Sequence, residues 1–169
     1  MQENFLLAQA KKGNAQAMEK LISAYYDSIF AYCCRRLSDR QTAQDITQET
    51  FCHMLASLDS YRHCGKMQNF LYRIAGNLCR DYLKKKKPVY MEELPEPAER
   101  DSFTGQAENS LLVRQALDGL TEELREAVLL RFYQDLRFED IAQIQGSSVS
   151  TAKYRVKKAL ALLKAQMEA

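Results

Sequence analysis

The sequence predicts an all-α protein that consists of two small helical domains joined by a flexible acidic linker. The 169 residues include only six glycines and three prolines, with few runs of β-branched residues, so a strand-rich fold is not expected. Hydrophobic residues make up 46% of the chain, which is enough apolar material to build folded cores. We expect the domains at residues 1–87 and 109–169 and the linker at residues 88–108.

The predicted linker differs from both flanking segments in charge and in proline content. Residues 88–108 contain all three prolines and six acidic residues against one arginine, a net charge of −5. By contrast, residues 1–87 carry +6 and residues 109–169 carry +1. Proline interrupts helices, and a segment with so little apolar periodicity has nothing to bury. We therefore interpret it as an extended tether rather than an ordered surface loop.

Three helices are predicted in the N-terminal domain. The first starts after Asn14, a suitable N-cap, and continues as one long apolar stripe. The second follows Asp39, and the third runs from about Met67 to Lys86. The residues expected to point inward are Thr47, Phe51, Met54 and Leu58 on the second helix and Phe70, Leu71, Ile74 and Leu78 on the third.

The outward face of the second helix carries Asp45, Gln48, Glu49 and Cys52, three or four residues apart. Asp45 and Glu49 stand four positions apart and repel each other mildly, from which an exposed helix gains nothing. A solvated polar face and a docking surface for a basic partner protein explain this pattern about equally well.

A basic stripe is predicted on the third helix, formed by Arg73, Asn77, Arg80 and Lys84. Residues 62–87 hold eight basic residues against one acid, and this charge is costly unless a polyanion accepts it. Aromatic rings lie between these charges, and such rings suit unpaired nucleic-acid bases. The rings are those of Tyr61, Phe70, Tyr72 and Tyr82, of which Phe70 is expected in the core. The pattern favours nucleic-acid binding over an ordinary solvated face.

Four short helices are predicted in the C-terminal domain. Thr121 caps the second helix, and the third starts at Phe138 and stops at Gly146, a residue suited to the left-handed C-cap conformation. The last helix runs from Val149 to about Ala165. The side chains expected to pack the second helix are Leu124, Val128, Leu129 and Phe132. A helix, a glycine-containing turn and another helix form the outline of a helix-turn-helix.

The last helix has one apolar and one polar, basic side. The apolar side is expected to hold Val149, Ala152, Val156, Ala159, Leu160 and Leu163. The opposite side holds Ser150, Thr151, Tyr154, Lys157 and Lys158, with Lys153 and Arg155 at its flanks. Residues 149–164 include five basic residues and no acid. Short polar groups at the start of such a helix can approach base edges while lysines reach phosphates, so DNA binding is favoured over a solvated face.

No metal site, cofactor or catalytic centre is predicted. The five cysteines form no C-x-x-C pair, and their odd number does not favour a disulfide framework. The pairs Cys52–His53 and His63–Cys64 are adjacent in sequence, and adjacent helical side chains point in different directions, which disfavours chelation of one ion. The sequence contains no arrangement of serine, histidine and acid and no phosphate-binding glycine loop.

We also expect a cytoplasmic protein that does not insert into a membrane. The chain contains no run of 18 or more apolar residues, the length that a spanning helix needs. Residues 1–4 show no basic stretch of the kind that starts a secretion signal.

Three sequence blocks resemble one family, the extracytoplasmic-function (ECF) class of bacterial RNA polymerase sigma factors. Residues 45–51, DITQETF, are similar to the family's D-[LIV]-x-Q-E-[TVA]-F, and residues 70–82, FLYRIAGNLCRDY, are similar to W-L-x-R-I-A-x-N-x-x-x-D-x. The third block runs from Leu129 to Arg155 and resembles the family's reader of the minus-35 promoter element. The blocks occur in the family's order and cover nearly all of the chain outside the linker.

The resemblance implies a region 2-like helical bundle followed by a region 4-like helix-turn-helix, in a non-enzymatic protein that directs promoter-specific transcription initiation. The partners it implies are core RNA polymerase, promoter DNA and an anti-sigma factor. Docking on core polymerase is implied for Asp45, Gln48 and Glu49. Contacts with the opened minus-10 strand are implied for Tyr61, Lys66, Arg73, Asn77, Arg80 and Lys84. Contacts with the minus-35 duplex are implied for Arg131, Ser150, Thr151, Lys153, Tyr154, Lys157 and Lys158.

The chain departs from the family pattern at several positions, including residues 67–69 and the start of the last helix at residues 148–155. Phe70 stands where the family has tryptophan, and its smaller ring should preserve packing. Tyr154 stands where the family has a small serine, so the base preference does not transfer. Two other functions stay open: a sigma-like decoy that sequesters an anti-sigma factor, and a repressor that acts without polymerase. The basic run at residues 84–87 argues against a decoy, because a decoy has no use for phosphate contacts.

Overall fold

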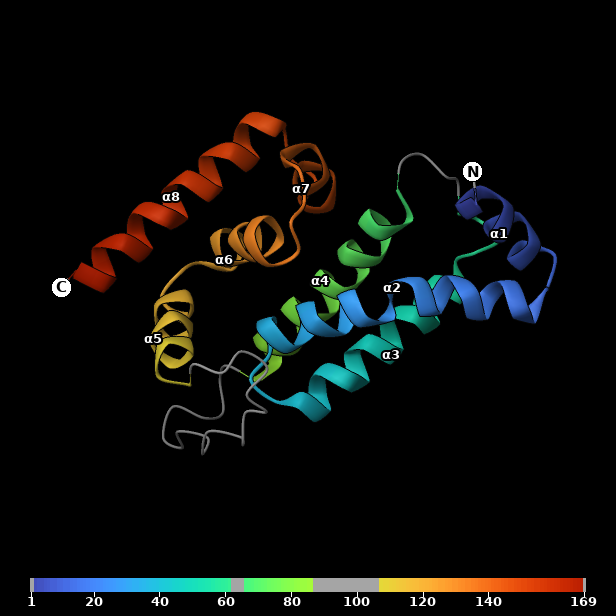
Figure 1. The fold of residues 1–169 in the computed structure, drawn as a ribbon, viewed down its shortest axis with the longest axis horizontal. Helices are drawn as coiled ribbons and strands as arrows, with labels where there is room; N and C mark the ends of the chain where they lie inside the picture. Colours follow the sequence, from blue (N-terminus) through green and yellow to red (C-terminus); the bar gives the residue numbers. More distant parts are fainter. Residues whose placement is uncertain (1, 62–65, 87–106, 169) are drawn as a thin grey trace. The chain divides into compact units, whose positions relative to one another are not determined.

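The computed structural model describes residues 2–61, 66–86 and 107–168, and within these ranges every regular element is helical. The first four helices in chain order are α1 (Gln2–Lys11), α2 (Ala15–Arg36), α3 (Arg40–Ala56) and α4 (Met67–Lys86). They are followed by α5 (Ala107–Asp118), α6 (Glu122–Val128), the π-helical turn η1 (Leu129–Tyr133), α7 (Phe138–Gln145) and α8 (Val149–Glu168) (Figure 1). The predicted all-α fold is confirmed for the described part of the chain.

The chain divides into two compact units, Met1–Asp81 and Tyr82–Ala169. Residues 88–106, which make up most of the predicted linker, lie outside the described residues. The last two linker positions, Ala107 and Glu108, instead begin α5.

In the first unit, α1 packs on α2 and α2 packs on α3. The side chain of Asn14 accepts hydrogen bonds from the first amides of α2, and that of Asp39 does the same for α3, so both predicted caps are confirmed. The Tyr32 ring of α2 meets the Tyr72 ring of α4 edge-on, with 5.3 Å between centroids. The largest fully buried side chains of this core are Tyr32, Leu21, Ile29, Leu37, Met54, Met67 and Leu71.

Helix α1 is an addition that the sequence pattern did not predict. Of its residues 3–11, it buries only Leu7 and Ala10, and a turn at Gly13 with φ +89° connects it to the cap of α2. With so few apolar residues facing the core, its periodicity is too weak to separate a helix from an irregular N-terminal segment.

The inward face of α4 differs in part from the prediction. Leu71 is buried as expected, but Phe70, Ile74 and Leu78 are only half-buried. The apolar side chains that α4 buries most are Met67, Leu71, Tyr72, Ala75 and Cys79. Ala75 and Cys79 are both fully buried, so the buried face of α4 is centred on small side chains and only partly overlaps the predicted apolar face. The Tyr72 ring is therefore a core ring, and burial raises the pKa of its hydroxyl to about 12.

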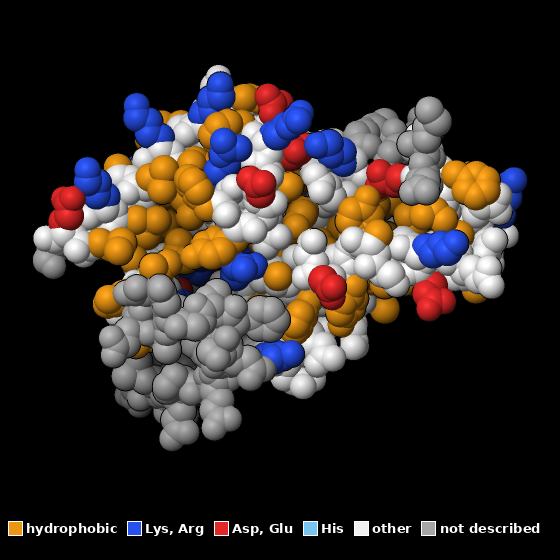
Figure 2. Space-filling view, viewed as in Figure 1, with side chains coloured by type: hydrophobic (Ala, Val, Ile, Leu, Met, Phe, Trp, Pro, Cys, Tyr) orange, Lys and Arg blue, Asp and Glu red, His pale blue; other side chains and the backbone are white. Residues whose placement is uncertain are grey.

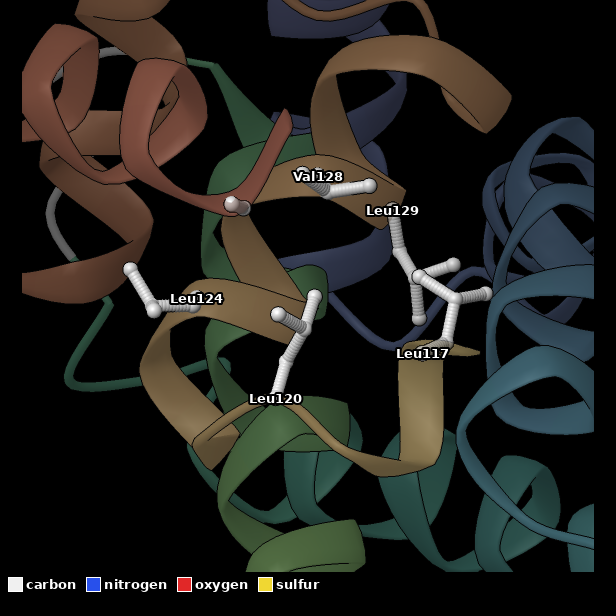
Figure 3. Packing of buried hydrophobic residues seen from close by; sticks show 6 residues of the cluster. Leu117, Leu120, Leu124, Val128 and Leu129 are labelled. Carbon is white, nitrogen blue, oxygen red and sulfur yellow. The ribbon is translucent and has the colours of Figure 1, made fainter. Parts of the chain in front are cut away.

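In the second unit, α8 packs on α5, α6 and α7. Figure 3 shows the core cluster between α5, α6 and the start of η1. Its buried members are Leu117, Leu120, Leu124, Val128, Leu129 and Ala159, against which Val113 and Leu163 pack. Thr121 caps α6 as predicted, since its hydroxyl accepts from the Leu124 amide at 3.4 Å.

Two side chains predicted in this core are exposed. Phe132 is 55% exposed because the chain widens into η1, where the Gln134 amide donates to the Leu129 carbonyl five residues earlier, and the widened turn rotates Phe132 off the α-helical register. Leu160 is 43% exposed. The buried face of α8 runs through Ala152, Val156 and Ala159, and Leu160 lies about 100° around the helix from Ala159.

The predicted helix-turn-helix is confirmed as α7, a turn and α8. Gly146 closes α7 in the left-handed conformation, with φ +64°. The Ser147 amide donates to the Ala142 carbonyl at 2.9 Å, which satisfies one of the last carbonyls of α7. Ser148 then caps α8, since its Oγ accepts from the Thr151 amide at 3.1 Å.

Candidate nucleic-acid and partner interfaces

The polar face of α8 is open to solvent. Tyr154 is 59% exposed, and Ala152, Val156 and Ala159 are buried on the opposite side of the helix. The other exposed residues of this face are Ser150, Lys153, Lys157 and Lys158, while Thr151 is half-buried. Figure 2 shows Lys and Arg side chains along the surface of α8. The structure thus brings together on one helix all the predicted minus-35 residues except Arg131.

Arg155 braces the start of α8 against the two preceding helices. Its Nη1 donates to Gln145 Oε1 of α7 at 3.0 Å, and its Nη2 lies 3.9 Å from the Glu123 carboxylate of α6. Gln145 in turn donates from Nε2 to the Glu123 carbonyl at 3.0 Å. These bonds connect the start of α8 to α6 and α7, in addition to the packing of its buried face on the same helices. The sequence analysis placed Arg155 at the flank of the polar face of α8. The sequence pattern does not show whether a basic side chain at that position points to solvent or, as here, to the neighbouring helix.

Arg131 lies in η1 rather than on α8, and the Phe138 ring connects it to the α8 face. Its Nη1 donates to the Leu136 carbonyl at 3.0 Å, and its guanidinium carbon lies 4.3 Å from the centroid of the Phe138 ring. Lys153 Nζ lies 5.9 Å from the same centroid. Arg131 therefore orders the turn before α7, while its guanidinium, with five N–H donors, has further donors to offer.

The basic stripe of α4 is formed as predicted. Arg73, Asn77 and Lys84 are exposed and Arg80 is half-buried, at spacings of three or four residues along one side of the helix. Arg80 Nη1 donates to Asn77 Oδ1 at 3.3 Å, so these two side chains present one joined polar surface.

Two further predicted minus-10 residues lie just before this helix. Lys66 is exposed, and its backbone carbonyl accepts from the Asn69 amide in the first turn of α4 at 3.1 Å. Tyr61 is half-buried, with its ring centroid 4.6 Å from that of Phe70. The Tyr61 ring is therefore packed against α4.

The outward face of α3 carries Asp45, Gln48 and Glu49, all exposed, as predicted. Asp45 accepts from Gln41 Nε2 at 3.3 Å, and Glu49 lies 3.6 Å from His53 Nε2 in a pair whose side chains are each more than half exposed. Contacts of this kind on a helix surface are weak and leave the carboxylates available to a partner. The buried side of the same helix consists of Ala43, Ile46, Thr47, Thr50, Phe51 and Met54.

The described cysteines are all free thiols. Cys33 and Cys79 are buried, and a hydrogen bond between their side chains lowers the pKa of the Cys33 thiol. Cys52 is exposed and Cys34 is half-buried. Within the described ranges, no group of three or more histidine, cysteine or acidic side chains could hold a metal ion, and no helix is long and apolar enough to cross a membrane. The pair His63–Cys64 lies outside these ranges.

Two family matches cover most of the chain. The Sigma-70 region 2 family matches residues 21–89, which include α3 and α4, and the Sigma-70 region 4 family matches residues 110–163, which include the helix-turn-helix. Among curated relatives, the ECF RNA polymerase sigma factor SigW of Bacillus subtilis (strain 168) is 27% identical over 95% of this chain and 94% of its own length.

Solved structures share the fold. CnrH, in its complex with the cytosolic domain of CnrY, has a TM-score of 0.79 at 22% identity, with coverage of 99% of this chain and 98% of that chain. The sigma factor RpoE, in its complex with the anti-sigma factor NepR from Bartonella quintana, has a TM-score of 0.69 at 23% identity, with coverage of 89% and 96%.

The two matched regions, in this order, define a sigma-70-type transcription initiation factor. The chain belongs to the ECF RNA polymerase sigma factors, a family of non-catalytic factors that direct promoter-specific transcription initiation. The resemblance of the three sequence blocks is thereby confirmed.

Proposed function

We propose that this sigma factor docks on core polymerase through α3, reads the minus-35 duplex with α8 and holds the opened minus-10 strand along α4. The observation that carries the proposal is the exposed polar face of α8. This face lies opposite the buried side chains of Ala152, Val156 and Ala159, and α8 is the second helix of the helix-turn-helix. In this motif the second helix enters the major groove.

The minus-35 element would be read by the first turns of α8. Ser150, Lys153 and Tyr154 lie on the exposed face near the N-terminus of the helix, where side chains of a recognition helix approach base edges. Lys157 and Lys158 lie one turn further along and suit phosphate contacts, which fix register without reading sequence. Tyr154 offers a ring and a hydroxyl, with Lys158 Nζ 5.7 Å from the ring centroid.

The minus-10 strand would bind along α4. Arg73, Arg80 and Lys84 supply the positive charge that attracts a phosphate backbone, and Asn77 supplies both a donor and an acceptor for a base. Tyr61 and Lys66 add an aromatic ring and a cation before the helix. Splayed bases of an opened strand stack on such rings, whereas paired bases inside a duplex do not.

Docking on core polymerase would use Asp45, Gln48 and Glu49, whose two carboxylates and one amide suit a basic protein surface. Phosphodiester synthesis would stay with the polymerase, so the chain needs no catalytic group, and this work would take place in the cytoplasm. We also infer an anti-sigma partner, since the RpoE structure that shares this fold is a complex with an anti-sigma factor.

The test is run-off transcription by the purified chain with bacterial core polymerase, on templates with randomised minus-35 and minus-10 elements. We expect transcripts that start at defined positions, and we expect the templates that yield them to be enriched in one minus-35 sequence and one minus-10 sequence. The absence of any promoter-dependent product would contradict the proposal. A gel shift without polymerase separates a repressor, which binds tightly alone, from a sigma factor, which needs core enzyme.

A further inference from the structure

We propose that Lys11, at the end of α1, is a positioning residue for promoter recognition: it holds Tyr61 beside the basic stripe of α4 and thereby sharpens minus-10 selectivity. This inference rests on the proposed role of Tyr61 and α4 in binding the minus-10 strand.

Two contacts join Lys11 to Tyr61, although fifty residues separate them in sequence. Lys11 Nζ donates to the Tyr61 carbonyl at 2.7 Å, a length typical of a charge-assisted hydrogen bond. The same ammonium lies 6.0 Å from the centroid of the Tyr61 ring, within the range of a cation–π contact. One side chain thus engages both the backbone and the ring of Tyr61.

Phe70 contacts the Tyr61 ring as well. The two ring centroids are 4.6 Å apart, and Phe70 lies in the first turn of α4. Arg73 follows Phe70 by three residues, so the two are neighbours on the helix surface. Tyr61 is therefore held by α1 and α4 at the end of the stripe where Arg73 lies.

Helix α1 is itself fixed, which gives Lys11 a defined position. Leu7 and Ala10 are buried against the core, and the Tyr25 hydroxyl of α2 donates a hydrogen bond to the Glu3 carboxylate. Burial, with help from this bond, raises the pKa of Tyr25 and keeps its donor proton in place. A helix anchored at both ends can hold a side chain at its C-terminus against another segment.

The chain supplies its own matched control for this role. Lys12 is the next residue, carries the same charge and is exposed. Replacing either lysine by methionine removes one positive charge at nearly the same place. A difference between the two variants therefore reports the contacts of Lys11 and not the loss of charge.

The first experiment tests the positioning without DNA. The chain contains no tryptophan, so Tyr61→Trp introduces a single indole that can be excited selectively over the tyrosines, and it keeps the carbonyl that Lys11 binds. We expect Lys11→Met to shift the emission maximum to longer wavelength and to lower the anisotropy, and Lys12→Met to change neither. Equal spectra for the two methionine variants would overturn the inference, whatever the outcome of transcription assays.

The second experiment tests the consequence with the full chain and core polymerase, on templates with a randomised minus-10 and a fixed minus-35 element. We expect Lys11→Met to lower minus-10 discrimination roughly threefold to tenfold, the range that one hydrogen bond supplies. Lys11→Arg should restore discrimination, because a guanidinium provides the same charge and donor. Lys12→Met should behave like the wild type.

The outcomes separate the inference from the proposed function. If the wild type yields no promoter-dependent product, the proposed function fails and the selectivity role fails with it. If the wild type transcribes but Lys11→Met and Lys12→Met discriminate equally, only the inference is overturned. Equal losses in minus-35 discrimination and core affinity for Lys11→Met would also overturn it, because they would indicate a general folding role.

Discussion

Arg155 of α8 and Gln145 of α7 are joined by a 3.0 Å hydrogen bond across the turn of the helix-turn-helix. Gln145 also donates to the backbone of α6, so one amide side chain connects three helices. The angle between α7 and α8 decides which residues of α8 can enter a groove. Under the proposed function, this polar contact helps to orient the side chains of α8 that would read bases.

Arg155→Ala should lower the free energy of unfolding by about 1 kcal/mol, the usual contribution of a partly buried hydrogen bond. Urea denaturation of the full chain measures this loss. In a double-mutant cycle with Gln145→Ala, the two losses should be less than additive, because each variant breaks the same bond. Lys157→Ala removes an equal charge from an exposed position and should cost far less. Equal costs for Arg155→Ala and Lys157→Ala would refute a bracing role.

Lys157→Ala should weaken binding to minus-35 DNA similarly for all sequences and lower the salt slope by about one, as expected for the loss of one phosphate contact. Binding titrations of the full chain in complex with core polymerase, with promoter duplex DNA at several salt concentrations, measure the slope. Lys20→Ala, an exposed residue of α2, removes the same charge elsewhere and serves as control. A slope that Lys157→Ala leaves unchanged would place this lysine in solvent rather than against a phosphate.

The sequence predicted those helices whose ends are set by a capping residue and whose buried face is set by the spacing of apolar residues. Asn14 and Asp39 mark the starts of α2 and α3 because their side chains bond the first amides, and Gly146 marks the end of α7 because it takes a positive φ. The exposed faces of α3, α4 and α8 follow in the same way from side-chain periodicity. For this reason the predicted site residues on these helices lie on shared surfaces.

The remaining features depend on tertiary contacts that local patterns do not contain. Phe132 leaves the core because η1 inserts a wider turn, which no residue between Leu129 and Tyr133 signals by type. Tyr72 looks like a ring for stacking bases, yet it is buried against Tyr32. The contact of Lys11 with Tyr61 joins segments fifty residues apart, and α1 has too few buried residues to be predicted as a helix.

The stability of the first unit should fall as the pH rises from 10 towards 12, in part because of Tyr72. Burial raises its folded-state pKa from 10.0 to about 12, so between these values the folded state keeps a proton that the unfolded state has lost. Stability then decreases with pH. Tyr72→Phe should flatten this decline by about 1 to 2 kcal/mol over the interval, since one pKa unit corresponds to about 1.4 kcal/mol. Denaturation at several pH values measures it, with the exposed Tyr154→Phe as control. If stability falls equally steeply with pH in Tyr72→Phe and in Tyr154→Phe, the buried Tyr72 hydroxyl is not a cause of the decline.

Asp45→Asn combined with Glu49→Gln should weaken the affinity for core polymerase about tenfold while preserving the fold. Both replacements keep the size of the side chain and remove the charge that a basic surface would pair with. The two carboxylates are exposed and make only surface contacts, so the free energy of unfolding should change by less than about 0.5 kcal/mol. The matched control is Glu19→Gln with Asp59→Asn, which removes two exposed charges from elsewhere in the same unit. Competition with labelled wild-type chain for core polymerase measures both double variants. Equal affinities for the two would remove α3 from the docking surface, whereas a selective loss in the first would locate the surface on α3, opposite its buried Thr47–Thr50–Met54 side.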